Sequence, residues 1–193
     1  MVMQILLGPQ DPLPNLRQAI DTINPDGPVV CITAGWRDSE GEIEELQDVA
    51  GRPVEDLKLY QRAENVFANE PAIRELHRER QDNLKELQRL YRIRLVPTIT
   101  AARKLLRTRA EEELLRVEQR AAIAQLRAPD SHHLRRIQAI HQNFNHRRAE
   151  LDLPQALAQR EEVRRAVEKA ALVLVAGGHV AVLLNRIRLF GVD

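Results

Sequence analysis

Aromatic side chains are rare in this sequence of 193 residues and make up only 3% of it. Proteins that hold single-stranded nucleic acid by base stacking need exposed Phe, Tyr or Trp, so this composition argues against that class. Cysteine occurs once, as Cys31, which excludes an internal disulfide framework and a cysteine-rich zinc site. Because free cysteine is among the most buried residue types, we expect Cys31 to be a structural thiol.

Long apolar runs are also missing, and none approaches the length needed to cross a bilayer. The N-terminal residues 1–4 lack the basic region of a signal peptide. Hydrophobic residues make up 44% of the chain and charged residues 30%, which is typical of a globular protein and not of a disordered one. We therefore expect a cytoplasmic protein with no membrane partner.

Charge is unevenly distributed along the chain, although the net charge is only +1. Residues 1–61 carry four basic and eleven acidic side chains, whereas residues 62–170 carry twenty-three basic and sixteen acidic ones. This segregation predicts two distinct parts that attract one another, or a basic part that meets an acidic partner.

Strand and helix patterns alternate in the first third of the sequence. Short apolar runs at 3–7, 29–33 and 54–60 predict strands, and helical spacing at 13–23 and 40–50 predicts helices between them. An alternation of strand and helix is typical of a parallel sheet. We therefore predict an α/β fold with a doubly wound, Rossmann-like sheet, which is incomplete in this chain.

The pattern changes to a purely helical one over residues 62–170. Apolar residues there form narrow stripes with a spacing of three and four, which predicts coiled-coil-like, antiparallel helices. Proline breaks or kinks a helix interior, so we expect a hinge near Pro97 and new helices that begin at Pro129 and Pro154.

The chain then returns to an α/β pattern. Residues 171–176 form a continuous apolar run, which is typical of a central strand, and residues 180–190 predict a helix that is apolar around most of its circumference. We interpret residues 1–61 with 171–193 as one α/β half-domain, and residues 62–170 as a helical insertion. An uncovered strand and helix would favour self-association, or binding of a second polypeptide, through residues 171–193.

The junction between the last strand and the last helix contains Gly177 and Gly178. Glycines at the carboxyl end of a parallel strand let backbone N–H groups approach a phosphate, a carboxylate or a developing oxyanion, next to the positive end of a helix. The alternative is that these glycines only form a tight turn, which is the more frequent role of glycine at such junctions. A dinucleotide-binding fingerprint is not met, because there is no third glycine at the required spacing.

Residues 173–184, with their apolar strand, Gly-Gly turn and helix, resemble the type 1 glutamine amidotransferase-like superfamily. They are most similar to its cyanophycinase and dipeptidase E branch of serine peptidases, and residues 32–36 resemble that branch's second strand. The resemblance covers about residues 3–60 and 171–190. It implies hydrolysis of an amide or peptide bond by a Ser or Cys nucleophile.

The same resemblance implies that Gly177 or Gly178 donates a backbone N–H to the oxyanion, while His179 stands where these peptidases have Asn. The family's nucleophile lies on a Gly-x-Ser/Cys-x-Gly elbow, and no such motif occurs in the sequence. We therefore expect no catalytic residue in this chain, only ligand or oxyanion contacts at Gly177, Gly178 and His179. On this interpretation the chain corresponds to an inactive N-terminal half that acts through association.

The histidines and arginines of the insertion do not predict a metal or nucleic-acid site. Four histidines between residues 132 and 146 lack the i,i+4 spacing and the nearby acids of a zinc protease, and we expect neither metal nor cofactor. Arginine pairs at 135–136, 147–148 and 164–165 could hold phosphates, but sixteen acidic residues of the insertion favour a solvated surface. A non-catalytic module that binds a protein through the insertion remains the alternative function.

Overall fold

The computed structural model describes residues 3–192, and 71% of the chain is helical. One three-stranded sheet is the only β structure within these residues. The predicted doubly wound, Rossmann-like α/β fold is therefore wrong, and the protein is mostly helical. The chain divides into two compact units, which are described separately: unit 1 comprises residues 3–70 and 153–192, and unit 2 comprises Pro71–Asp152.

The sheet of unit 1 is parallel, with the strand order β2-β1-β3. The central strand β1 is fully buried, in line with its continuous apolar sequence. The last strand, β3, lies at an edge and is only half buried, so its predicted central position is wrong. The strands are β1 (Val29–Ile32), β2 (Glu55–Asp56) and β3 (Leu172–Val175).

A fourth strand predicted at the N-terminus does not form. Residues 3–7 have no regular secondary structure, and Leu6 is 98% exposed. An apolar run becomes a strand only where a neighbouring strand accepts its backbone hydrogen bonds, and no strand of the described chain pairs with this segment. The predicted strand over 54–60 also shrinks to two residues, because a helix begins at Leu59.

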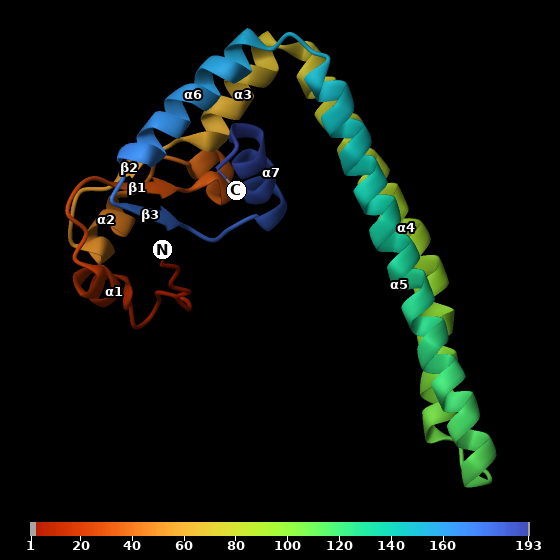
Figure 1. The fold of residues 1–193 in the computed structure, drawn as a ribbon. Helices are drawn as coiled ribbons and strands as arrows, with labels where there is room; N and C mark the ends of the chain where they lie inside the picture. The colour runs from red at the N-terminus through yellow and green to blue at the C-terminus, as the bar shows by residue number, and fades with distance from the viewer. Residues whose placement is uncertain (1–2, 193) are drawn as a thin grey trace. The chain divides into compact units, whose positions relative to one another are not determined.

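Helices pack on both sides of this sheet (Figure 1). Helices α1 and α2 cover one side, where Leu16, Ile20 and Ala50 form a buried cluster with Val29 and Cys31 of β1. Helices α3 and α6 lie on the other side. The helices of unit 1 are α1 (Leu16–Ile23), α2 (Glu44–Ala50), α3 (Leu59–Asn69), α6 (Pro154–Lys169) and α7 (Val180–Phe190), together with the 3-10 helix η1 (Ala34–Ser39).

Polar contacts explain why α3 and α6 belong to unit 1, although the sequence assigned both to the insertion. The Arg62 side chain on α3 reaches Glu162 on α6 at 2.6 Å. The Glu70 carboxylate accepts the backbone N–H groups of Gln155 and Ala156, at 2.8 and 3.2 Å, and so caps the start of α6. The helical part that forms a compact unit of its own spans Pro71–Asp152.

Unit 2 is an antiparallel helical hairpin made of α4 (Pro71–Arg107) and α5 (Glu112–Ala149) (Figure 1). Hydrogen bonds between the two helices define the register of the hairpin. The residue numbers of the bonded partners rise along α4 as they fall along α5, as expected for antiparallel helices. The hydrogen-bonded pairs are Glu79 with Arg147, Gln88 with His133, Tyr91 with Asp130 and Leu105 with Gln119.

The predicted hinge at Pro97 and the predicted helix start at Pro129 are both wrong. Each proline lies inside a continuous helix. A proline interior to a helix removes one backbone hydrogen bond, but the pairing of two long helices stabilises the residues on either side of the break. Pro129 is itself buried, whereas Pro97 is exposed.

The seam between α4 and α5 is narrow and partly polar. Ile73 and Leu76 of α4 and Phe144 of α5 are buried along it. The Arg80 guanidinium lies 4.1 Å from the centre of the Phe144 ring, and the His77 ring meets the same ring edge-on at 4.8 Å. Such specific polar contacts in a narrow seam favour one register over others.

Candidate functional site

The three parallel strands bring their carboxyl ends to one edge of the sheet, which is where ligands bind in many parallel sheets. Strand β1 continues into Thr33 and Gly35, strand β2 ends at Asp56, and strand β3 continues into Gly177. All residues predicted from the sequence as ligand contacts lie at this edge. Gly177, Gly178 and His179 are exposed there.

The Gly-Gly turn packs tightly against the turn that follows β1. Gly178 has a φ of +136°, and a Cβ atom at this position would lie 2.6 Å from the carbonyl oxygen of Gly35. The backbone N–H of His179 donates to that same oxygen at 2.8 Å. A Cβ on Gly35 would in turn meet the Gly177 carbonyl oxygen at 3.1 Å. Glycine at Gly35 and Gly178 is therefore explained by close packing of two turns.

Helix α7 begins directly after these glycines. The Nδ1 atom of His179 accepts the backbone N–H of Val182 at 3.3 Å and caps the helix. The N–H groups of Gly177 and Gly178 donate to no acceptor within residues 3–192. Two backbone donors next to a helix N-terminus can hold an anionic group, while the Nδ1 atom of His179 is occupied by its capping bond.

Cys31 does not supply a nucleophile to this edge. The residue has no exposed surface, and burial raises the pKa of its thiol to about 12, with the Asp56 and Glu40 carboxylates adding to the shift. The nucleophilic form of cysteine is the thiolate, so this thiol is inert at neutral pH. Beside it, the Thr33 hydroxyl donates to the Asp56 carboxylate at 2.7 Å.

Two further charged residues near this edge were not predicted from the sequence. Glu40 is only 4% exposed and accepts the backbone N–H groups of Tyr60 and Gln61 at 2.8 and 2.7 Å, which caps α3. Burial raises the pKa of the Glu40 carboxyl, although the two backbone hydrogen bonds oppose this shift. No sequence motif marks Glu40 as a cap, because it lies twenty residues before the helix that it caps.

Arg186 is the second of these residues and lies in α7, whose other polar residues are Asn185 and Arg188. Its guanidinium pairs with Glu64 at 2.7 Å and lies 4.9 Å from the centre of the Phe67 ring. Burial lowers the pKa of Arg186. An arginine in a mostly apolar helix is a sequence feature that can indicate such a pair, but α7 also contains Arg188, so the sequence did not single out Arg186. Its contacts are those of a packing residue.

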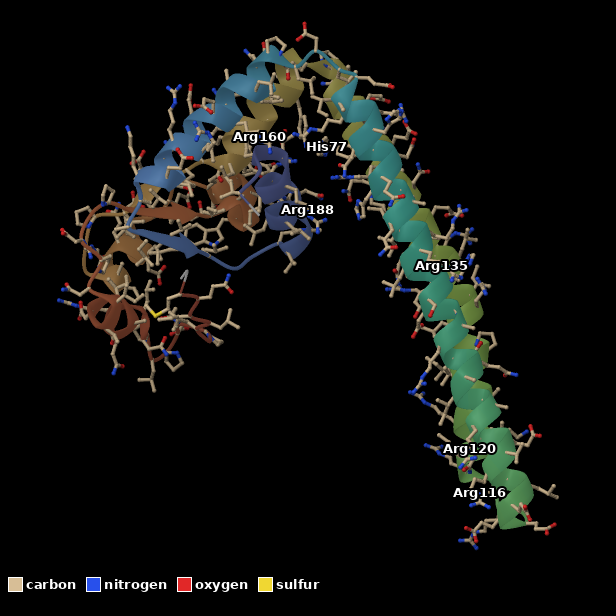
Figure 2. The ribbon with its side chains drawn as sticks, in the orientation of Figure 1. His77, Arg116, Arg120, Arg135, Arg160 and Arg188 are labelled. Atoms are coloured by element: carbon tan, nitrogen blue, oxygen red, sulfur yellow. The ribbon has the colours of Figure 1, made fainter. Side chains whose placement is uncertain are left out.

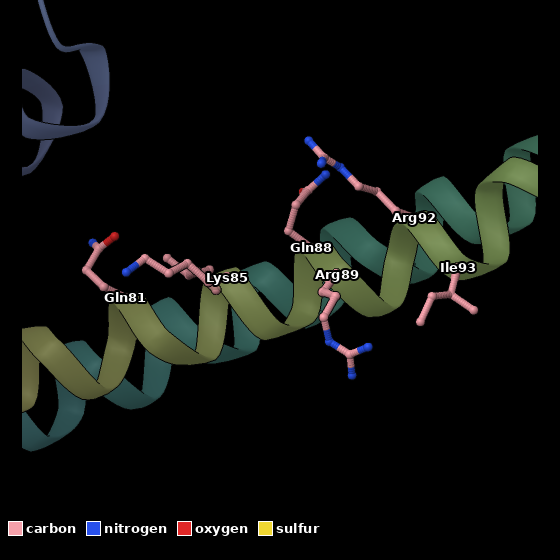
Figure 3. Close-up of a pocket in the computed structure, with 7 residues that line it drawn as sticks. Gln81, Lys85, Gln88, Arg89, Arg92 and Ile93 are labelled. Atoms are coloured by element: carbon pink, nitrogen blue, oxygen red, sulfur yellow. The ribbon is translucent and has the colours of Figure 1, made fainter.

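Hollows on the described surface offer no enclosed site. The hollow in Figure 3 is lined by Gln81, Lys85, Gln88, Arg89, Arg92 and Ile93, which all belong to α4. A hollow with walls from one helix cannot surround a small molecule. No group of three or more His, Cys, Asp or Glu side chains within residues 3–192 is placed to hold a metal ion. No helix of that range is both long and apolar enough to span a membrane.

Comparison with known protein families, curated proteins and solved structures found no match to the chain. The chemistry of the site therefore has to be argued from the residues alone. The edge of the sheet provides two backbone donors at Gly177 and Gly178, next to the His179 imidazole whose Nδ1 atom caps α7. Such an arrangement can bind an anion or a carbonyl oxygen.

Proposed function

We propose that the chain is a non-catalytic binding protein that associates with another polypeptide, in the first instance a second copy of itself, through an apolar surface at its C-terminal end. The observation that carries this proposal is the exposure of three apolar side chains on β3 and α7. Val175 is 56% exposed, Val180 73% and Leu184 41%. We call these three residues the edge surface.

The edge surface combines two features that favour association. Strand β3 has a neighbouring strand on one side only, so the backbone groups along its other side are available to another chain. On α7, Val180 and Leu184 lie one turn apart and so share one side of the helix, which begins five residues after the end of β3. Contiguous exposed apolar side chains of this kind usually mark an interface.

Analytical ultracentrifugation of the double variant Val180→Glu/Leu184→Glu tests the proposal. The wild-type protein is expected to sediment as a dimer or larger species at about 50 μM, and the variant as a monomer, because each buried glutamate would leave an unpaired charge. Leu13→Glu/Leu157→Glu is the matched control, since both leucines are exposed outside the edge surface, and it should behave as the wild type. A wild-type monomer over the whole concentration range contradicts the proposal.

We also propose, as a second function, that the Gly-Gly turn is half of an amide-hydrolase site that another polypeptide completes. The resemblance of residues 173–184 to the amidotransferase-like peptidases and the unused N–H groups of Gly177 and Gly178 support it. The purified chain should show no amidase, peptidase or glutaminase turnover. A product burst that disappears in Cys31→Ala would contradict this expectation. A cytoplasmic location fits both proposals, because Cys31 is a free buried thiol.

A further inference from the structure

The hairpin of unit 2 carries twelve exposed arginines that form no ion pair within residues 3–192, and six of them form two rows, one on each helix. The ion pairs that the hairpin does form involve other arginines, such as Arg89 with Glu86 and Arg147 with Glu79. The six residues are Arg92, Arg103 and Arg107 on α4, and Arg116, Arg120 and Arg127 on α5; Figure 2 labels Arg116 and Arg120.

These six residues lie on one side of the hairpin, which we call the arginine face. On α4 the steps from Arg92 to Arg103 and from Arg103 to Arg107 are eleven and four residues, close to three turns and one turn. On α5 the steps of four and seven residues from Arg116 to Arg120 and Arg127 are close to one and two turns. Each helix therefore carries one longitudinal row of arginines.

The two rows face the same way because of where each lies relative to the seam. Arg92 and Arg103 directly follow the seam residues Tyr91 and Ala102. The same holds on α5, where Arg120 follows Gln119, whose side chain reaches the α4 backbone. Seen from one end of an antiparallel pair, the chain of one helix winds clockwise and that of the other anticlockwise, although both are right-handed. The position after a seam residue therefore lies on the same side of the pair in both helices. The register then places Arg103 across from Arg120.

The α4 row of this face lies in a segment without acidic side chains. Residues 87–110 contain seven Arg or Lys residues and no Asp or Glu. The prediction of a solvated surface from the sequence rested on the acids of the whole insertion, and those of the hairpin lie outside residues 87–110. On α5, Glu112 and Glu113 lie one turn before Arg116, and Asp130 lies one turn after Arg127, where its carboxylate accepts the Tyr91 hydroxyl at 2.5 Å.

The arrangement fits an extended polyanion. From Arg92 to Arg107 the α4 row is about 22 Å long at 1.5 Å per residue. Over that length duplex DNA presents about thirteen phosphate charges, at one per ~1.7 Å of its axis. The arginine guanidinium is also the side chain best shaped for bidentate contact with phosphate.

Other polyanions fit less well. A helix that lies on a membrane needs one free apolar stripe, whereas the exposed apolar residues of α4, such as Leu90 and Leu106, lie sixteen residues apart and so on different sides of the helix. Single-stranded nucleic acid is held largely by aromatic stacking, and aromatic residues make up 3% of the sequence.

We propose that the arginine face of the hairpin binds the phosphate backbone of double-stranded DNA, without reading its sequence. This function is independent of the edge surface, which lies on unit 1. Six arginine–phosphate contacts predict that log K falls with log salt concentration with a slope of about −5, at ~0.9 per phosphate. Affinity for a duplex should therefore fall about 1,000-fold between 50 and 200 mM NaCl.

Fluorescence anisotropy of the full chain with a labelled 25-base-pair DNA duplex, over a series of NaCl concentrations, tests the proposal. In Arg92→Gln/Arg103→Gln/Arg120→Gln the slope should become shallower by about 3, because three phosphate contacts are lost. The matched control Arg94→Gln/Lys104→Gln/Arg136→Gln removes the same charge from exposed positions outside the arginine face, and its slope should change by less than about 1. Glutamine is a good helix former, and circular dichroism checks that both variants stay helical.

Four outcomes would overturn the proposal. They are equal effects of the two triple variants, no binding of the wild type to the duplex at 50 mM NaCl, tighter binding to a matched RNA duplex, and tighter binding to poly-glutamate or to phosphatidylserine vesicles. Equal effects would show that net charge alone drives binding. Absence of binding would show that the arginine face does not bind DNA. Tighter binding to RNA, poly-glutamate or vesicles would show that another polyanion is its preferred partner.

Discussion

Substitution of Gly178 by alanine should destabilise unit 1 far more than substitution of its neighbour Gly177. At Gly178 an alanine Cβ would lie 2.6 Å from the Gly35 carbonyl oxygen and 2.7 Å from its carbon, and these atoms belong to a buried turn. The φ of +136° is also accessible almost only to glycine, which costs a side chain about 1–3 kcal/mol. Strain and displacement of the Gly35 turn together should lower the free energy of unfolding by about 3 kcal/mol.

Gly177 provides the matched control, because nothing lies within 4 Å of its would-be Cβ and its φ is not in the positive region. Gly177→Ala should therefore change stability by less than about 0.5 kcal/mol. Urea unfolding followed by the fluorescence of Trp36 is a suitable assay, since this single tryptophan lies beside Gly35 in unit 1. Equal stabilities of the two variants would refute the conclusion that close packing of the two turns requires glycine at position 178.

Two further predictions concern one buried residue in each unit. Burial raises the pKa of the Glu40 carboxyl above 4.5 in the folded state, so the folded state binds this proton more tightly than the unfolded state does. The wild type should therefore lose stability relative to Glu40→Gln as the pH rises from about 4 through the raised pKa. Urea titrations from about pH 4 to about pH 7 measure this difference, and an increase with pH would mean that the backbone hydrogen bonds outweigh burial. Phe144→Ala should lower the stability of the hairpin by about 3–5 kcal/mol, since the ring is 4% exposed and contacts Arg80 and His77. Leu134→Ala, at an exposed site of the same helix, should lower it by less than about 0.5 kcal/mol. Thermal melts followed by circular dichroism compare the two, and similar melting temperatures would contradict a central role of Phe144 in the seam.

The sequence by itself predicted the elements that local physics determines. The strand over Val29–Ile32 and the helix over Val180–Phe190 are confirmed, because a continuous apolar run and a long apolar helix with glycines before and after it leave few alternatives. The helical character of residues 71–149 is likewise confirmed, since its spacing of three and four repeats over many turns.

Elements that depend on a distant partner were predicted less well. Residues 3–7 are as apolar as a strand but have no neighbour to pair with, while Pro97 and Pro129 lie inside helices that the opposite helix of the hairpin stabilises. The apolar sequence of Leu172–Val175 gave no indication that it lies at an edge, because the position of a strand depends on which other strands exist.

The candidate sites divide in the same way. Gly177 and Gly178 were visible as a local motif, but only the tertiary structure brings them against Gly35 and so explains why glycine is needed at that contact. The arginine face was hidden in the sequence, where basic and acidic residues are mixed in the count. Pairing of two antiparallel helices decides which side chains share a side, and this pairing brings Arg103 and Arg120, seventeen residues apart in the chain, onto one face.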